Sequence, residues 1–285
     1  MTVTPIPRKF SSDELAERGW RYELVTLADG TTDYEMVPLT EDEFVHPQEG
    51  YHLPNTTFHD RIIAEARDML TRRYRERPDV GVFSDLLIEW DSPDMKDHCP
   101  DVFVAFGITN KQQNRGKFIV ANEGVRPTFV LEVVSPRYRR ADRETKVLHY
   151  ARTKVQEYVI VDRRRYRTIV LDEVLGYRLV GGAYQPITPD DDGRIFCETV
   201  GLWISLQEGH LVMQDGTTGE RLLTSDELES IAEQERQRAE QERQRAEQER
   251  QRAEQERQRA EQMAAELQQL HDRLRSMGID PDTLS

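Results

Sequence analysis

The chain has 285 residues, of which 37% are hydrophobic, enough apolar material for one core of about 200 residues or two smaller ones. Its 53 acidic residues outnumber its 39 basic ones and give a net charge of −14. This excess excludes loose, non-specific DNA binding by the surface as a whole, but it leaves room for a metal site or a local basic patch.

No apolar run approaches the length of a membrane span, and the first residues lack the apolar segment of a signal peptide. The two cysteines, Cys99 and Cys197, form neither a CxxC pair nor a disulfide framework, so we expect reduced thiols. These features predict a soluble, cytoplasmic protein with no membrane partner.

Residues 1–55 are polar and irregular, with only short strand-like pieces, and we interpret them as an N-terminal arm that packs on the following domain. The first strong helix is expected from about Thr57 to Tyr74. Apolar residues recur there at helical spacing, behind candidate caps at Asn55 and Thr56. A folded domain is therefore expected to begin at residue 56.

The next part of the chain alternates between strand-like runs and one helix. β-Branched and aromatic content predicts the strands, and apolar residues at helical spacing predict the helix. In chain order we expect strands at Val80–Trp90, Asp101–Phe106 and Thr128–Val134, a helix at Asp142–Lys154, and a strand at Glu157–Val161. The strand–helix–strand order over residues 128–161 is a crossover unit, which predicts that its two strands are parallel neighbours.

From Arg167 to about Met213, short strand-like runs alternate with turns rich in Gly, Pro and Asp. This pattern predicts an antiparallel extension that completes a mixed α/β domain over residues 56–224. The remaining residues, 225–285, are expected to form a helix that begins with a cap near Ser225.

The tail contains four perfect copies of the heptad QERQRAE over residues 234–261, and its 8 Arg and 8 Glu make the repeat neutral. The seam of this repeat consists of Ala and Glu, where a coiled coil requires larger apolar residues. Only residues 263–277 carry an apolar seam. The tail is therefore either a coiled coil closed at its distal end, which would make a homo-oligomer such as a dimer, or a solvated single helix held by Arg–Glu pairs.

Glu132 is the sharpest anomaly in the sequence, because it lies within the apolar strand TFVLEVV. A carboxylate in a core strand is costly without a cationic partner or a metal. Asp101 begins a neighbouring apolar strand, so the two carboxylates can converge. A divalent ion that prefers oxygen ligands, Mg²⁺ or Mn²⁺, would relieve their repulsion.

Lys146 and Tyr150, one turn apart on the expected helix, complete the set of candidates. A Lys near the carboxylates would orient water or stabilise charge on a phosphate. Each residue also has an ordinary explanation, since Pro-Asp is common in turns, a strand Glu often pairs with Arg or Lys, and a helix Lys is usually solvated. Their occurrence together, in this order, favours a functional site.

The segments PDVFVAFG, TFVLEVVSP, DRETKVLHYA and VQEYVIVD resemble, in order and spacing, the Uma-type restriction endonuclease family of the PD-(D/E)XK nuclease superfamily. The resemblance covers most of the chain beyond residue 55 and includes the charged helical tail. It implies a restriction-endonuclease-like fold, with a mixed central sheet flanked by helices, an antiparallel β extension and a long C-terminal helix.

The resemblance also implies roles for individual residues. Asp101 matches the Asp of the first half-motif and Glu132 matches the Glu of the second, which would make both of them ligands of a catalytic Mg²⁺. The Val133 carbonyl would be a third ligand. The usual Lys, two residues after that Glu, is replaced by Val134, and Lys146 matches a helix Lys that takes its place.

Two further positions match the family pattern, His59 on the first helix and Tyr150 one turn beyond Lys146. The function implied is a metal-dependent endonuclease that hydrolyses phosphodiester bonds in DNA. Independently of the resemblance, we expect a homo-oligomer formed through residues 263–277 or through the nuclease domain. Two alternatives stay open. The acidic excess favours an inactive nuclease-fold scaffold that assembles through its tail. The other alternative is a protein that binds DNA without cleaving it.

Overall fold

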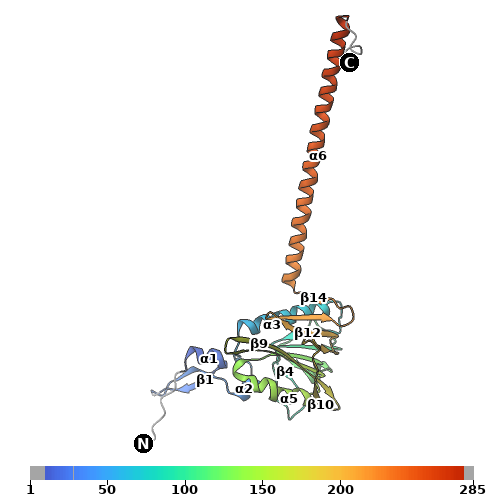
Figure 1. Cartoon of the computed structure of the whole chain (residues 1–285). Coiled ribbons are helices and arrows are strands. Elements are labelled where there is room, and N and C mark those ends of the chain that lie inside the picture. Colours follow the sequence, from blue (N-terminus) through green and yellow to red (C-terminus); the bar gives the residue numbers. More distant parts are fainter. Residues whose placement is uncertain (1–9, 28, 279–285) are drawn as a thin grey trace. The chain divides into compact units, whose positions relative to one another are not determined.

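The computed structural model describes residues 10–27 and 29–278, apart from the Tyr166 side chain, and the chain divides into two compact units after Thr224 (Figure 1). The first unit contains the helices α1 (Ser12–Arg18), α2 (Glu41–Val45), α3 (Thr57–Arg73), α4 (Val120–Glu123) and α5 (Lys146–Arg152). Its strands are β1 (Trp20–Thr26), β2 (Thr32–Pro38), β3 (Val80–Ser84), β4 (Ile88–Glu89), β5 (Val102–Phe106), β6 (Phe118–Ile119), β7 (Phe129–Val133), β8 (Glu157–Tyr166), β9 (Ile169–Val180), β10 (Ala183–Pro186), β11 (Ile195–Cys197), β12 (Leu202–Gln207), β13 (His210–Asp215) and β14 (Arg221–Leu222).

The centre of this unit is a six-stranded mixed sheet in the order β10-β9-β8-β7-β5-β3. Strands β7 and β8 are parallel, which confirms the predicted crossover, while the other neighbours are antiparallel. Strands β11 to β14 form a second, antiparallel sheet. The fold is therefore the predicted mixed α/β architecture with an antiparallel extension.

Two apolar cores lie on opposite faces of the central sheet. On one face, Leu131 and Val133 pack with α3 and the β11–β14 sheet. On the other face, Val130 and Val134 pack with Tyr150 of α5 and with β4 and β6. This alternation along β7 assigns the even-numbered residues to the α5 side, so Glu132 is directed toward α5.

Helix α3 begins one residue after Thr56, whose side chain accepts a hydrogen bond from the His59 backbone N–H. This N-cap satisfies one of the donors that every helix leaves unpaired at its start. Ile62, Ala66 and Leu70 are fully buried on the sheet side. The cap thus fixes the first turn of α3, which carries His59.

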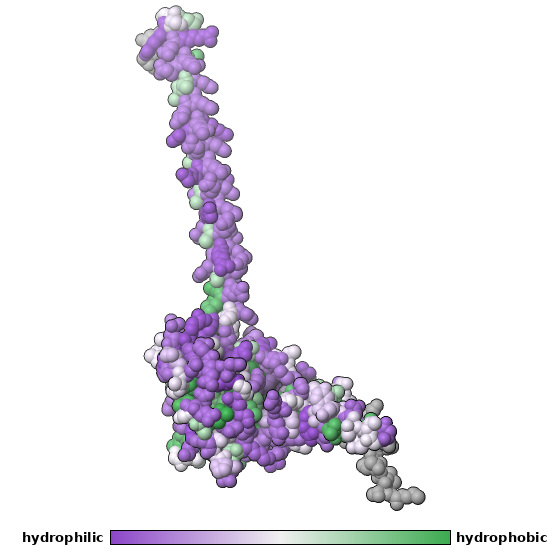
Figure 2. Space-filling model, turned by 180° about the vertical axis from the view of Figure 1, so that it is seen from behind, coloured by the Kyte–Doolittle hydropathy of each residue, from purple (hydrophilic) through white to green (hydrophobic). Residues whose placement is uncertain are grey.

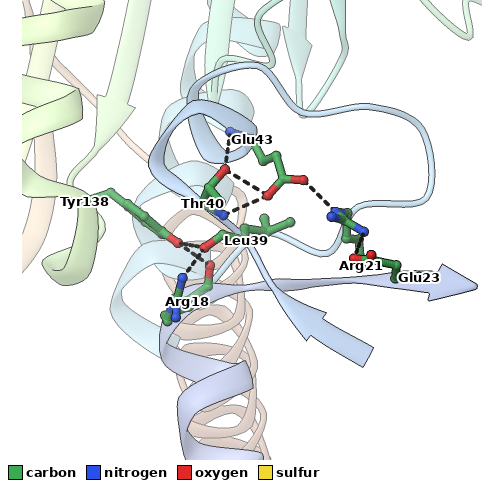
Figure 3. Close-up of polar contacts among 7 residues, drawn as sticks. All are labelled: Arg18, Arg21, Glu23, Leu39, Thr40, Glu43 and Tyr138. Atoms are coloured by element: carbon green, nitrogen blue, oxygen red, sulfur yellow. Dashed lines mark hydrogen bonds and ion pairs between the residues drawn. The ribbon is translucent and has the colours of Figure 1, made fainter. Parts of the chain in front are cut away.

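The N-terminal residues are more regular than the sequence predicted. Strands β1 and β2 form an antiparallel hairpin, and Thr40 and Glu43 form a capping box at α2. Glu43 also accepts a hydrogen bond from Arg21, and the Tyr138 hydroxyl lies 2.8 Å from the Leu39 carbonyl (Figure 3). These polar contacts tie the segment to the rest of the unit, although its apolar content is low.

Three predicted boundaries were wrong. The strand expected at Val80–Trp90 is divided into β3 and β4, because Asp85 between them has a positive φ of 50° that no strand residue adopts. The helix expected from Asp142 begins with a π-helical turn over Ala141–Thr145, before α5. Strand β8 continues past Val161, since β9 pairs with its polar second half.

The second unit contains helix α6 (Ser225–Ser276), which has no buried residue. Figure 2 shows its surface as almost entirely hydrophilic, with isolated pale green positions. Glu233 accepts a hydrogen bond from Gln237 and lies 3.7 Å from Arg236, and pairs of this kind recur along the repeat. None of the helices in the described ranges combines the length and the apolar character needed to cross a membrane.

Candidate active site

Asp101 and Glu132 lie side by side at one end of the adjacent inner strands β5 and β7. Asp101 directly precedes β5, Glu132 is the fourth residue of β7, and the antiparallel register pairs Val102 with Leu131. Asp101 is therefore next to Glu132 across the ladder. The Val133 backbone N–H donates to Asp101 Oδ2 at 2.6 Å, which holds this carboxylate at the end of β7.

His59 is the cationic partner of Asp101. Its Nε2 lies 3.2 Å from Asp101 Oδ2. Burial lowers the pKa of His59, but the charge and the hydrogen bond of Asp101 outweigh burial and raise it to about 9. In return, although burial alone would raise the pKa of Asp101, His59 holds it below its usual value. The two side chains form an ion pair at neutral pH.

Glu132 is held by two side chains of α5. The Tyr150 hydroxyl donates to Glu132 Oε1 at 2.7 Å, and Lys146 Nζ lies 3.1 Å from Glu132 Oε2. Because residues four apart on a helix face the same way, Lys146 and Tyr150 reach the same carboxylate. Glu132 is 1% exposed, and this burial raises its pKa even though Lys146 opposes the shift.

A further carboxylate, Asp142, lies in the π-helical turn before α5. Lys146 Nζ is 2.9 Å from its Oδ1, while its Oδ2 accepts a hydrogen bond from the Ser135 N–H. Burial raises the pKa of Asp142 above its usual value, although the charge of Lys146 opposes this shift. Lys146 itself is buried, and its carboxylate neighbours overcome the effect of burial and raise its pKa well above the usual value. Lys146 is therefore charged and shared between two acids.

Asp85 was missed by the sequence analysis. Its backbone N–H donates to the Asp101 carbonyl at 3.3 Å, which brings it beside Asp101 at the end of β3. The residue is exposed, but neighbouring atoms partly desolvate its carboxyl group. This desolvation and the negative charge of Asp101 raise the pKa of Asp85 to about 6. Its positive φ of 50° is a backbone strain of the kind found at functional sites. No local pattern distinguishes Asp85, because an Asp at the end of a strand usually marks a turn.

A cavity of about 850 Å³ opens beside the carboxylates, and Asp85 and Cys99 contribute to its wall. Asp101 is 7% exposed and Glu132 is almost completely covered. Lys96 and Lys117 also line the cavity, but both form ion pairs, with Asp42 and Asp97 respectively. Asp85 therefore connects the wall of this cavity to Asp101.

The structure brings five of the predicted residues together, namely His59, Asp101, Glu132, Lys146 and Tyr150. Val133 contributes its N–H to Asp101. Val134 packs in the apolar core beside Tyr150, so the position of the usual superfamily Lys is filled by a buried aliphatic side chain. Lys146 reaches Glu132 from α5 instead.

The donor set suits a hard divalent cation. Carboxylate oxygens are the ligands that Mg²⁺ and Mn²⁺ prefer. Asp101 Oδ2 is engaged by Val133 and His59, whereas Oδ1 receives no hydrogen bond from the described residues. Without a metal, the His59 and Lys146 cations offset only part of the negative charge of the three buried carboxylates, Asp101, Glu132 and Asp142. The residues thus fit a divalent ion in charge and in donor type.

A mixed sheet that carries an Asp and a Glu at the end of two adjacent strands, with a Lys from the following helix in contact with the Glu, is typical of a restriction-endonuclease-like domain. The Uma2 family, described as "Putative restriction endonuclease", matches residues 51–207. This match spans more than half of the chain, and the chain belongs to the Uma2 family.

One similar solved structure is described as the crystal structure of a putative nuclease belonging to DUF820 from Anabaena variabilis ATCC 29413 at 1.96 Å resolution. It is 16% identical, with a TM-score of 0.40, and the match covers 57% of this chain and 91% of that chain. No match was found among curated proteins.

Proposed function

We propose that the chain is a Mg²⁺-dependent or Mn²⁺-dependent endonuclease that hydrolyses phosphodiester bonds in DNA. Asp101 and Glu132 would be the metal ligands and Lys146 the third catalytic residue. The observation that carries the proposal is the 3.1 Å contact of Lys146 Nζ with Glu132, at the sheet edge that Glu132 shares with Asp101. This contact supplies the cation that Val134 cannot provide.

A bound divalent ion would lower the pKa of a coordinated water and polarise the phosphate. The protein's own groups prepare the site around it. The Val133 N–H orients Asp101, and the Tyr150 hydroxyl orients Glu132. Lys146 would stabilise negative charge on the phosphate. We also propose the Val133 carbonyl as a third ligand and His59 as the residue that positions Asp101.

The β8–β9 hairpin is the part of the chain best suited to contact the DNA backbone. Its residues Arg164 and Arg165 are exposed, and neither forms an ion pair with the described residues. The outer half of the hairpin lies beside α3, because the Arg163 guanidinium lies over the ring of Phe58, next to His59 in the sequence of α3. Two unpaired cations at this place would provide a local basic surface on an acidic protein.

Metal binding is the first test of this function. We expect calorimetric titration of the metal-free full-length protein with MgCl₂ to give a binding isotherm. The Asp101→Asn variant should give none, because it loses a charged ligand. Asp192→Asn, an exposed loop change of the same chemistry, is the matched control and should bind like the wild type. A wild-type protein that binds neither Mg²⁺ nor Mn²⁺ would overturn the proposal.

A second candidate is a scaffold that assembles through its tail. It is favoured by the exposure of three apolar residues on α6, with exposed fractions of 64% for Met263, 55% for Leu267 and 54% for Leu270. Side chains of this size and spacing are typical of a helix that pairs with another helix. Assembly and hydrolysis can coexist, so a separate measurement is needed for each.

A further inference from the structure

Three histidines from separate parts of the first unit gather outside the carboxylate site. His46 follows α2, His98 precedes β5, and His149 lies in α5. One nitrogen of each ring lies within 4.8 Å of the corresponding nitrogens of the other two. They are the only such group of potential ligands within residues 10–27 and 29–278, and no carboxylate belongs to it.

The hydrogen bonds of the cluster define the protonation of each ring. His46 Nδ1 is 2.9 Å from the Asp97 carbonyl, which can only accept, so Nδ1 carries the proton and Nε2 is available. Trp90 Nε1 donates to His98 Nδ1 at 2.9 Å, so His98 carries its proton on Nε2 and donates it to His149 Nδ1 at 3.0 Å. Without a metal, one proton therefore occupies the space between His98 and His149.

This geometry is close to that of a metal site. Two imidazole nitrogens bound to one tetrahedral Zn²⁺ at ~2.0–2.1 Å are separated by about 3.3 Å, and the His98–His149 pair is at 3.0 Å. The His46 bond to a backbone carbonyl is the arrangement that orients ligating histidines in metalloproteins. A ligating histidine must be neutral, and the Trp90 N–H that donates to His98 Nδ1 requires that nitrogen to be unprotonated.

We propose that His46, His98 and His149 form a second metal site, which takes a transition metal of the zinc class. Three neutral nitrogen donors without a carboxylate select Zn²⁺, Co²⁺, Ni²⁺ or Cu²⁺ over Mg²⁺. Three protein ligands leave a fourth position for water, and His46 lines the 850 Å³ cavity from which the metal can enter. The site joins α2, the segment before β5, and α5, and α5 carries Lys146 and Tyr150.

Binding requires one rearrangement. The His98 proton moves from Nε2 to Nδ1, so that Nε2 can bind the metal, and no net proton is released. The Trp90 indole N–H then loses its acceptor and faces the new N–H at His98 Nδ1, so the indole has to move away from it. Two unsatisfied N–H groups cost less than a metal site contributes. Replacing Trp90 with Phe removes the competing donor, so we expect this variant to bind zinc more tightly than the wild type.

The test uses the full-length protein after treatment with a chelator. ZnCl₂ and CoCl₂ are titrated in a background that carries Asp101→Asn and Glu132→Gln, so that the carboxylate site does not contribute. We expect one metal per chain and the intense visible absorption of four-coordinate cobalt. Loss of one ligand in His149→Gln or His46→Gln should weaken binding on the order of 100-fold or more. His271→Gln, the same substitution on exposed α6, should bind normally.

Three results would overturn the proposal. The first is the absence of zinc binding in both the background protein and the wild type. The second is a cobalt spectrum and a zinc affinity that stay unchanged in His149→Gln and His46→Gln. Circular dichroism identifies any variant that has lost its fold, and using two half-buried positions keeps the test valid if one of them fails to fold. Binding that depends only on Asp101 and Glu132 would assign the zinc to the carboxylate site and likewise contradict the proposal.

Discussion

Lys146 connects the chemistry of the site to its stability. It is buried between Glu132 and Asp142, and its charge is what makes two acids tolerable in the core. The nearby aromatic ring of Phe44 lies 4.9 Å from Nζ and adds a cation–π contact. This single side chain therefore has both a catalytic role in our proposal and a structural role.

We predict that Lys146→Met lowers the rate of DNA cleavage about 100-fold or more, because charge on the phosphate loses its stabilising cation. It should also lower the free energy of unfolding by about 3–5 kcal/mol, since a buried pair loses one partner. Cleavage kinetics and urea unfolding measure the two effects. Lys154→Met, an exposed change just after α5, should alter neither. Unchanged cleavage by folded Lys146→Met would rule out the catalytic role.

We expect Tyr150→Phe to have smaller effects on cleavage and stability than Lys146→Met. It removes the hydroxyl that orients Glu132 but keeps the ring that fills the core. Stability should fall by about 1 kcal/mol, the net contribution of one hydrogen bond. The cleavage rate should fall while Mg²⁺ affinity changes little, because Glu132 keeps its carboxyl group and its contact with Lys146. Equal losses of rate and affinity would instead assign Tyr150 to the metal site.

The sequence identified some residues of the site and could not identify others. Glu132 was visible because a carboxylate within TFVLEVV breaks an apolar strand. Asp85 and Asp142 were not, because an Asp at the end of a strand or before a helix is ordinary turn or cap chemistry. Likewise, the pairing of Lys146 with Glu132 depends on how α5 packs on the sheet, which no local pattern encodes.

At the scale of elements, the crossover from β7 through α5 to β8 was predictable from strand–helix–strand order. The outer half of β8 was not, because its residues Arg163 to Arg165 have no apolar pattern and are ordered by pairing with β9. The N-terminal hairpin was also missed. Its order depends on distant contacts such as that of Tyr138 with Leu39.

Asp215 links β13 to the end of α3 and makes one contribution to stability dependent on pH. Hydrogen bonds from the Thr218 backbone N–H and from Arg73 hold the pKa of Asp215 at about 2. The unfolded value is about 3.9. The stabilisation is therefore complete above that value and is lost as the pH falls toward 2.

We accordingly predict that Asp215→Asn destabilises the protein by about 1 kcal/mol at neutral pH, a figure reduced for solvent screening. The difference from the wild type should shrink below about pH 3. Urea unfolding across this range measures it. A difference that is constant with pH would show that the charge of Asp215 is not its cause.

The β8–β9 hairpin gives a prediction for DNA binding. Arg164→Ala and Arg165→Ala should each weaken binding to all sequences and reduce the slope of log affinity against log salt by about 1. Fluorescence anisotropy with a labelled duplex measures both. Arg250→Ala, an exposed change in α6, is the control. If the salt slope is the same in every variant, the hairpin does not contact DNA phosphates.

At the scale of the whole molecule, the first unit and the tail are stabilised by different kinds of interaction. The unit up to Thr224 is stabilised by two large cores and a smaller apolar cluster around Phe44 and Tyr138. In contrast, α6 buries nothing and relies on local pairs such as Arg257–Glu254. The heptad made a helix predictable. Whether two such helices pair depends on a second chain, so the sequence left it open.

We predict that the full-length protein is a dimer or higher oligomer and that removing residues 226–285 makes it monomeric, because the apolar seam of 263–277 is lost. Light scattering measures the mass of both forms. Substituting Leu267 and Leu270 with Glu in the full chain should have the same effect as the truncation. Monomeric full-length protein would favour the solvated single helix, and an oligomer that survives truncation would assign assembly to the first unit.

The central claim is that Asp101, Glu132 and Lys146 form one hydrolytic site, and cleavage of supercoiled plasmid DNA tests it most directly. With Mg²⁺, we expect the wild type and the Asp192→Asn control to convert the plasmid to nicked or linear DNA. Asp101→Asn and Glu132→Gln should leave it intact, as should the wild type in the presence of a chelator. Cleavage by folded Asp101→Asn at the wild-type rate would contradict the claim.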